Sequence, residues 1–427
     1  MRRRLAFVGL ASALLATTSA CSSDPSATRP VVEVFGPIVG DSGTELARVL
    51  REASADTAVE LRYVGVTSFN EQLEDRLARG DRPGIALLSQ PGLLRDLVER
   101  DIVVPLPDEV ADASADAYPE QLVELVSLAD GPAAVWLTVD IKGLVWYQPD
   151  EFGSRDLDVP TTLDQLAELS DRIRTGEDAA PWCLTMEAGA STGWVGTDWV
   201  EDYVLRRLGQ TSYAAWASGR LRFDNAEIRG IFEELDMLLR APGAVSGGQR
   251  AILTVPWERT ADLINADTPT CLMAHQGDFL RREFPPSTAV GPDGDIDFFP
   301  LPGPDSDDRP LLVGGMLATP LDDAPEVATA IGILSGTDLA ERLDRTSEFL
   351  SPNLDVDPAV FDEDPTSARL LDLVDDSTHL AFDGSDLMPA AVGAGTFWTG
   401  MRSFFAGEHI DAILTDIDTG WTQRADG

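Results

Sequence analysis

The first hundred residues alternate between short β-rich runs and amphipathic runs, and this alternation constrains the fold more than any other feature. Runs rich in aliphatic and β-branched residues occupy 31–35, 59–65 and 85–89. Between them, 45–52 and 69–80 carry apolar residues at the spacing of one helical face. Alternation of strands and helices predicts an α/β fold in which mostly parallel sheets are covered by helices.

The same pattern continues through the middle of the chain. We expect strands at 134–139, 144–148, 270–275 and 296–302, and helices at 160–176 and 226–243. In open α/β sheets, ligands bind at the carboxyl ends of the strands, so polar residues directly after the expected strands are candidates for a binding site.

The chain is too long for one hydrophobic core, so we expect two lobes. No internal repeat is visible, and a linker-like composition occurs only after residue 21. We therefore expect the chain to cross between the lobes, so that each lobe is built from segments that are not consecutive in sequence. We assign 31–140 and 276–316 to the first lobe, and 141–275 and 317–427 to the second.

The N-terminus has the pattern of an export signal. Three arginines precede an apolar run, Leu5–Leu15, that is too short to span a bilayer, and small residues precede Cys21. This pattern predicts a lipoprotein signal peptide over 1–21, lipidation at Cys21 and a flexible tether over 22–30. The protein would then be extracytoplasmic and would contact the cell membrane only through its lipid anchor. An ordinary signal peptide with an unmodified cysteine is the alternative.

Charge and cysteine content exclude several classes of function. The net charge of −41 argues against binding to nucleic acid or to an anionic membrane surface, because both require basic patches. Cys183 and Cys271 remain as a pair in an oxidising compartment, and we predict that they form a disulfide. The three histidines are isolated in the sequence, so we expect no metal site. We also expect no cofactor.

The run FDGSDLMPAAVGAGTFWTGM at 382–401 gives the most direct indication of function. It combines Asp383, Ser385 and Asp386 with Trp398. Carboxylates accept hydrogen bonds from sugar hydroxyl groups, and the C–H face of a sugar ring packs on a flat aromatic ring. A glycine-rich start of a helix, followed by a tryptophan of the core, is the alternative interpretation.

Several segments, in the same order along the chain, resemble those of one protein family. They are FNEQLEDRL, PGIALLSQPGLLRDLVERDIVVPL, LTVDIKGLVWYQPDEF, PWCLTMEAGASTGWVGTDWVEDYVLRRLG, CLMAHQGDFLRREFP and FDGSDLMP. The chain resembles the maltose-binding-like solute-binding lipoproteins of carbohydrate ABC importers, in particular the α-glucoside-binding group. The resemblance implies a two-lobed periplasmic-binding-protein-like type II fold with a ligand cleft between the lobes. It also implies a non-catalytic monomer that delivers an oligosaccharide to permease subunits.

Candidate ligand-binding residues follow from strand ends and from the resemblance. They are Asp41, Ser42, Gln90, Asp140, Thr192, Trp194, Thr197, Asp198, Gln276, Gly315, Asp383, Ser385, Asp386 and Trp398. Helix capping is the alternative role for Asp41, Ser42, Thr197 and Asp198. Gln90 is alternatively a turn residue. For Lys142, the only lysine of the chain, we favour a hinge salt bridge. The remaining tryptophans, including Trp257, are expected in the core or at the rim.

Three rival functions remain open at this stage. A secreted glycoside hydrolase would need a pair of carboxylates, for which Asp383 with Asp386, or Glu187 with Asp198, are available. A binding protein of the same fold could present its ligand to a membrane sensor. The cargo could also be a glycerophosphodiester or another polyol. The expected binding loops contain few arginines, and this favours a neutral sugar.

Overall fold

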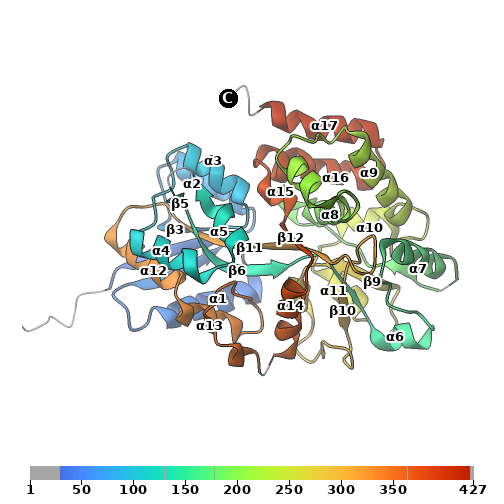
Figure 1. Ribbon diagram of the computed structural model, residues 1–427, viewed down its shortest axis with the longest axis horizontal. Helices are drawn as coiled ribbons and strands as arrows, with labels where there is room; N and C mark the ends of the chain where they lie inside the picture. Colours follow the sequence, from blue (N-terminus) through green and yellow to red (C-terminus); the bar gives the residue numbers. More distant parts are fainter. Residues whose placement is uncertain (1–28, 129–130, 177, 363, 424–427) are drawn as a thin grey trace, which may run out of the picture.

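Two mixed sheets, each covered by helices, form the two lobes of the protein in a computed structural model (Figure 1). The structure describes residues 29–128, 131–176, 178–362 and 364–423. The predicted signal peptide and Cys21 lie outside these ranges. Of the predicted tether, only Arg29 and Pro30 are described, and Arg29 donates hydrogen bonds to the carbonyls of Ser54 and Ala55.

The first lobe is built on the larger sheet, whose strand order is β12-β11-β3-β1-β2, with β6 also paired to β11. The second lobe is built on the sheet β10-β7-β9-β8, and a small ribbon pairs β4 with β5. The strands are β1 Val31–Gly36, β2 Glu60–Gly65, β3 Ile85–Leu88, β4 Ser127–Leu128, β5 Gly131–Pro132, β6 Val135–Ile141, β7 Leu144–Tyr147, β8 Ala180–Trp182, β9 Cys271–Gln276, β10 Asp297–Pro300, β11 Pro310–Pro320 and β12 His379–Phe382.

The helices of the first lobe lie at the left of Figure 1, and those of the second lobe lie at the right. The α-helices are α1 Gly40–Ala53, α2 Phe69–Ala78, α3 Pro91–Glu99, α4 Asp108–Ala117, α5 Glu120–Val126, α6 Pro149–Ser154, α7 Leu163–Gly176, α8 Trp194–Ala217, α9 Ala226–Leu239, α10 Gly248–Thr254, α11 Arg259–Ile264, α12 Pro325–Leu334, α13 Thr337–Asp344, α14 Pro365–Asp375, α15 Gly384–Leu387, α16 Trp398–Ala406 and α17 Ile410–Gln423. Short 3₁₀ segments are η1 Gly189–Ser191, η2 Asp278–Glu283 and η3 Pro358–Phe361, and η4 Ala391–Phe397 is a π-helix.

The alternation at the start of the chain is confirmed, but the prediction that the sheets are mostly parallel is wrong. β1 pairs in parallel with β2 and β3, as the strand–helix–strand pattern requires. However, β11 is antiparallel to both β3 and β6, and β7 is antiparallel to both β9 and β10. The reason is that the chain crosses between the lobes and re-enters each sheet from the opposite end.

The same crossings make the lobe boundaries differ from those expected. β10 lies within 276–316, which we assigned to the first lobe, yet it pairs with β7 of the second sheet. Conversely, α12 and α13 lie within 317–427 but pack on β1 and α1 of the first lobe. The strand β12, also from that range, pairs with β11.

The first crossing between lobes is a tight turn from β6 into β7. Gly143 has a left-handed backbone with φ of 68°, and a Cβ atom there would lie 2.7 Å from a carboxylate oxygen of Asp202. Glycine is therefore required at this turn. The turn directs the preceding residue, Lys142, into the region between the lobes, where its side chain pairs with residues of α8 and of the segment after β12.

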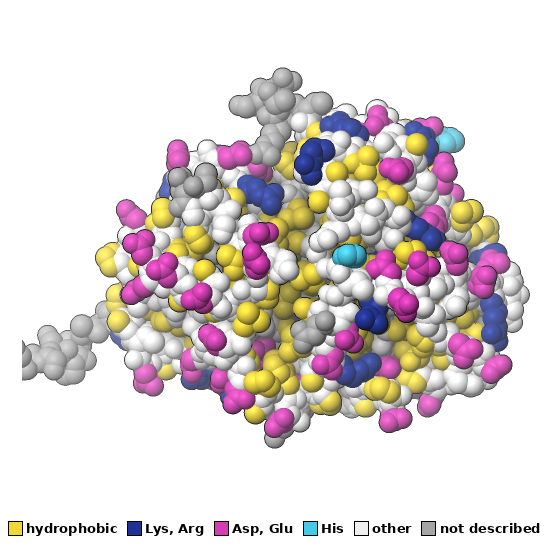
Figure 2. All heavy atoms as spheres, viewed as in Figure 1, with side chains coloured by type: hydrophobic (Ala, Val, Ile, Leu, Met, Phe, Trp, Pro, Cys, Tyr) yellow, Lys and Arg dark blue, Asp and Glu magenta, His cyan; other side chains and the backbone are white. Residues whose placement is uncertain are grey.

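Acidic side chains are spread over the face drawn in Figure 2, as expected from the net charge of −41. Among the helices of the described ranges, none combines the length and the apolar character needed to cross a lipid bilayer.

Candidate functional site

A cavity of about 510 Å³ lies between the two lobes. The first lobe supplies the loop after β1, the start of α1, and the middle of β11. The second lobe supplies the start of α8 and the segment before α11. The lining residues used below are Asp41, Ser42, Asp140, Lys142, Trp194, Asp198, Trp257, Glu258, Phe279, Arg282, Glu283, Gly314, Gly315, Asp383, Ser385, Asp386 and Trp398.

A second cavity, also of about 510 Å³, adjoins the first. Both are lined by Pro37, Val39, Ser89, Ser191, Trp194, Trp257, Glu258 and Trp398, so together they form one continuous cleft. The second cavity extends the cleft past Asn70, Gln90 and Glu187. The cleft has the size of ligand sites that enclose small organic molecules.

Aromatic rings form one wall of the cleft. Trp194 lies 5.3 Å from Trp257 and 5.7 Å from Phe279, measured between ring centroids. Trp398 lines both cavities, and the backbone of Trp398 approaches Gly193 so closely that a Cβ there would lie 2.4 Å from its carbonyl oxygen. Flat apolar surfaces of this kind suit the C–H face of a sugar ring.

The closed end of the cleft is a network of buried charges around Lys142. The ammonium of Lys142 donates hydrogen bonds to Asp198 at 3.0 and 3.2 Å and to Asp383 Oδ2 at 2.5 Å. The other oxygen of Asp383 accepts from the Ser385 hydroxyl at 2.9 Å and from the Asp386 amide at 3.0 Å. Asp383 therefore caps α15 and at the same time belongs to the wall of the cleft.

Behind this network, Glu201 of α8 fixes the segment after β12. Its carboxyl group accepts hydrogen bonds from the amides of Gly384 at 2.7 Å and Ser385 at 3.1 Å. The next residue of the helix, Asp202, pairs with Arg206 one turn further along and with His275 of β9. These buried polar groups therefore hold the Asp383–Asp386 turn in position.

The buried acids differ in pKa because their surroundings differ. Burial raises the pKa of Asp198 to about 7, although Lys142 opposes the shift. Burial, followed by the charge of Asp383, raises the pKa of Asp386 well above its ordinary value. Burial opposes ionisation of Asp383 as well, but the charge and hydrogen bond of Lys142 lower its pKa. The closed end therefore combines Asp383, whose lowered pKa favours the ionised form, with Asp386, whose raised pKa favours the protonated form.

Most of the sequence-predicted site residues line the cleft. The first cavity is lined by Asp41, Ser42, Asp140, Trp194, Asp198, Gly315, Asp383, Ser385, Asp386 and Trp398, and the second by Gln90. Gln90 is more than a turn residue, because its Oε1 accepts from Asn70 at 2.8 Å. Gly315 lies where a Cβ would be 2.3 Å from the Thr138 carbonyl oxygen, which explains the absence of a side chain there.

Three predicted residues do not line either cavity of the cleft. Thr192 forms a local turn, donating to Gly189 and accepting from the Ala188 amide. Thr197 is fully buried inside α8 and donates to the Trp194 carbonyl. Gln276 is buried at the end of β9, where its side chain accepts from the Gly277 amide. A polar residue after a strand can face the core, and the sequence carries no signal that separates the two cases.

The capping roles weighed for four of the residues are wrong. The N-cap of α1 is Val39, without a side-chain cap, so Asp41 and Ser42 lie within the first turn. The helix α8 begins at Trp194, and Thr197 and Asp198 therefore lie inside it. Both Asp41 and Asp198 line the cleft instead.

Sequence reasoning missed several residues of the cleft. Trp257 was expected in the core or at its rim but lines both cavities, and Phe279 joins its ring cluster at 5.8 Å. Lys142 does form the expected salt bridge between the lobes, but it also lines the cavity. Arg282 lines the cavity as well and donates to Asp140 at 3.2 Å. The segment PWER, which leads into α11, combines an aromatic with an acidic residue, and this signal was available in the sequence.

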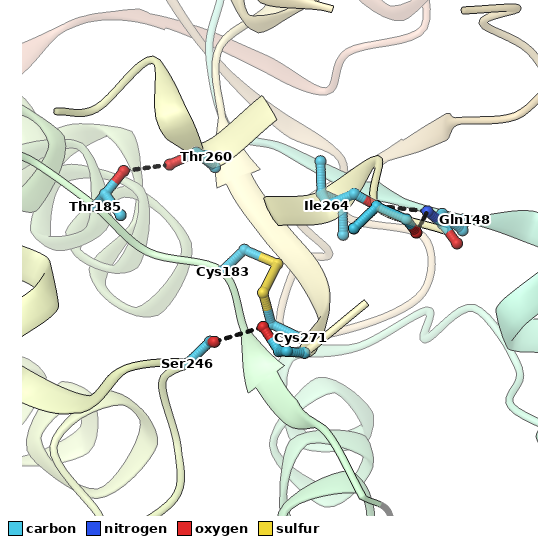
Figure 3. Close-up of a disulfide and its surroundings, with 9 residues drawn as sticks. Gln148, Cys183, Thr185, Ser246, Thr260, Ile264 and Cys271 are labelled. Carbon is cyan, nitrogen blue, oxygen red and sulfur yellow. Dashed lines mark hydrogen bonds between the residues drawn. A yellow bond between two sulfur atoms is a disulfide. The ribbon is translucent and has the colours of Figure 1, made fainter. Parts of the chain in front are cut away.

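The predicted disulfide between Cys183 and Cys271 is confirmed (Figure 3). It links the end of the β8 region to the first residue of β9, across a sequence separation of 88 residues. Two residues after Cys183, the hydroxyl of Thr185 lies 2.8 Å from that of Thr260 and also donates to the Pro256 carbonyl at 3.0 Å. The disulfide therefore lies beside the segment that carries Trp257 into the cleft.

Comparisons with known proteins agree with this geometry. A family model described as bacterial extracellular solute-binding protein matches residues 41–340. The chain is 32% identical to the alpha-glucosides-binding periplasmic protein AglE of Rhizobium meliloti, over 91% of this chain and 86% of that protein. It is 29% identical to the osmoprotective compounds-binding protein GgtB of Synechocystis, over 92% of this chain and 93% of that protein. The structure of maltose-bound T. maritima MalE3 is similar with a TM-score of 0.72, at 15% identity, covering 92% and 99% of the two chains.

The fold and the cleft thus define an α/β periplasmic solute-binding protein fold of the maltose-binding type. The chain belongs to the bacterial extracellular solute-binding protein family. It is a non-catalytic, extracytoplasmic binding protein for a sugar or similar solute of an ABC import system. The glycoside hydrolase considered above is therefore wrong. Asp383, the first acid of one proposed catalytic pair, is held ionised by Lys142.

Proposed function

We propose that the protein captures a neutral α-glucoside, or a related oligosaccharide, in the cleft and delivers it to the permease of an ABC importer. The observation that carries the proposal is that aromatic rings and fixed hydrogen-bond acceptors line the same cleft. Trp194, Trp257 and Trp398 offer ring faces, and Asp383 and Asp386 offer carboxyl groups. Sugars require both kinds of contact, because each ring has apolar C–H faces and a polar rim.

The charge of the cleft favours a neutral ligand over an anionic one. Its acidic lining residues are Asp41, Glu71, Asp140, Glu187, Asp198, Glu258, Glu283, Asp383 and Asp386, and its basic lining residues are Lys142 and Arg282. Both cations are already paired with carboxylates, at 2.5–3.2 Å. A glycerophosphodiester would therefore meet repulsion without a free arginine or lysine to hold its phosphate.

The names of the relatives support the sugar class but leave a second candidate. AglE is named for alpha-glucosides, and MalE3 was solved with maltose. GgtB is named for osmoprotective compounds. A neutral osmoprotective polyol or glucoside would fit the same cleft, because it too relies on hydroxyl groups rather than charge.

We further propose that Cys21 carries a lipid anchor and that the lobes close over the bound sugar before docking to the permease. The basic, apolar and small-residue pattern before Cys21 supports the anchor. The cleft between two lobes joined by crossing strands supports closure by hinge bending. Cys21→Ala should release the protein from the membrane fraction, whereas continued membrane attachment would contradict the anchor. Finding a permease pair encoded beside the chain would favour import over a sensor role, and its absence would favour the sensor.

A thermal-shift panel tests the ligand class. The mature domain without Cys21 is heated with maltose, trehalose, sucrose, longer α-glucans and glycerophosphocholine. A ligand that binds only the folded state raises the melting temperature by mass action. We expect a shift with at least one neutral α-glucoside and none with glycerophosphocholine. A shift with the phosphodiester alone would refute the sugar assignment.

A further inference from the structure

The ammonium group of Lys142 occupies the closed end of the cleft and is held there from several directions. It hydrogen bonds to Asp198 of α8 and to Asp383 at the end of β12, and the side chain is 10% exposed. Gly314 of β11 lies against its stem, since a Cβ there would be 3.1 Å from Lys142 Cε. The fold therefore fixes the position of the ammonium, unlike that of a lysine on the surface, whose side chain is flexible.

Without this ammonium, the same place would suit a cation. Asp198, Glu201 and Asp383 each offer a carboxylate oxygen, and these atoms lie within 4.8 Å of one another. Carboxylate oxygens at such spacing are ligands for hard divalent cations. The ring of Trp194 lies 5.5 Å from Lys142 Nζ, and an aromatic face attracts organic cations. Buried carboxylates beside an aromatic ring thus form a cation site that the chain fills with its own lysine.

We propose that Lys142 is a positioning residue that determines ligand specificity: its ammonium fills the cation position, excludes cationic ligands, and holds the carboxyl groups of Asp198 and Asp383 in place as acceptors for the hydroxyl groups of a neutral ligand. The inference rests on the proposed function, because it specifies which sugar-sized ligands the same cleft accepts.

The network explains why one cation has this effect. Asp383 uses its second oxygen to hold the Ser385 hydroxyl and the Asp386 amide, so the position of Asp383 sets the positions of both neighbours. Glu201 holds the amides of Gly384 and Ser385 from behind. If the ammonium is removed, like charges lie close together, and the carboxylates must take up protons or a foreign cation. Either change alters the acceptors that face the ligand.

The test replaces Lys142 with methionine, which has a similar length and no charge. The wild type and Lys142→Met are titrated with the α-glucoside found in the panel, with MnCl2 and with choline chloride. We expect Lys142→Met to bind the glucoside at least about thirtyfold more weakly, which is roughly the loss of one charge-assisted contact. We also expect saturable Mn²⁺ or choline binding that the wild type lacks. A purely structural role would not create a new cation site.

Two further variants distinguish the loss of the ammonium from a general loss of folding. Asp418→Ala removes a buried carboxylate that accepts from the Phe223 and Asp224 amides, away from the cleft, and should leave glucoside affinity unchanged. The double variant Lys142→Met, Asp198→Asn removes one charge of each sign. It should fold, should bind Mn²⁺ more weakly than Lys142→Met, and should still bind the glucoside poorly. If Lys142→Met does not fold alone, Mn²⁺ should restore a cooperative thermal unfolding transition.

The outcomes separate this inference from the proposed function. If the wild type binds no neutral glycoside, the proposed function fails. If the wild type binds a glucoside, and folded Lys142→Met or the folded double variant binds it within about threefold of the wild-type affinity, the role of Lys142 is overturned. The absence of any Mn²⁺ or choline effect on Lys142→Met overturns it as well.

Discussion

Removal of the disulfide should destabilise the second lobe by an amount set by the length of the loop that it closes. Cys183 and Cys271 are 88 residues apart and are both buried. In the chain-entropy model, closing a loop of this length restricts the unfolded chain by about 4.6 kcal/mol at 25 °C. This figure is a large share of the stability of a typical domain. The double variant Cys183→Ala, Cys271→Ala should therefore fold with a much lower resistance to urea.

Tryptophans buried in the second-lobe core allow this unfolding to be followed by fluorescence. Trp182 precedes Cys183, and its ring meets that of Trp199 edge to face at 4.8 Å in the core. With a denaturant slope of about 2–3 kcal/mol per M, the fluorescence midpoint of this transition should fall by roughly 1.5–2.3 M urea. Reduction of the wild type in denaturant should give the same shift. A midpoint within about 0.3 M of the oxidised wild type would refute the loop argument.

Three further predictions follow from single contacts. Trp257→Ala should weaken sugar binding by about tenfold or more through loss of stacking, as measured by calorimetry, and an unchanged affinity would remove Trp257 from the site. Gly315→Ala should cost about 1–3 kcal/mol in urea unfolding, because its Cβ would meet the Thr138 carbonyl; unchanged stability would contradict the close contact. Burial raises the pKa of Asp344 to about 7, above its unfolded value, so its contribution to stability is present at pH 4 and lost as pH rises through 7. Asp344→Asn should therefore flatten the loss of stability between pH 5 and 8, by on the order of 2–4 kcal/mol, and an unchanged slope would contradict this assignment.

The parts of the fold that depend on local pattern could be predicted from the sequence. The strands β1, β2 and β3 and the helices between them have clear periodicity, and their parallel pairing follows from the connecting helices. The position of β11 between β3 and β6 could not be predicted in this way. Its pairing joins segments far apart in sequence, and nothing in its own residues specifies direction. The lobe boundaries differed for the same reason.

The candidate site shows a similar limit. Asp383, Asp386 and Trp398 lie in one short run with a recognisable composition, and all three line the cleft. Thr197 and Gln276 also have polar side chains, but they lie on buried faces of α8 and β9. The role of Lys142 could not be predicted, because it depends on carboxylates from α8 and from the end of β12, which only the folded chain brings together.

The central claim is that a neutral sugar binds against the aromatic wall of the cleft. Isothermal titration of the wild type with the best α-glucoside of the panel, beside Trp398→Ala and Trp421→Ala, tests it most directly. Trp398 lines both cavities of the cleft, whereas Trp421 packs against the second-lobe core through α17. We predict one site per chain, a loss of at least about tenfold in affinity for Trp398→Ala, and unchanged affinity for Trp421→Ala. Equal affinity in the wild type and Trp398→Ala would contradict the account.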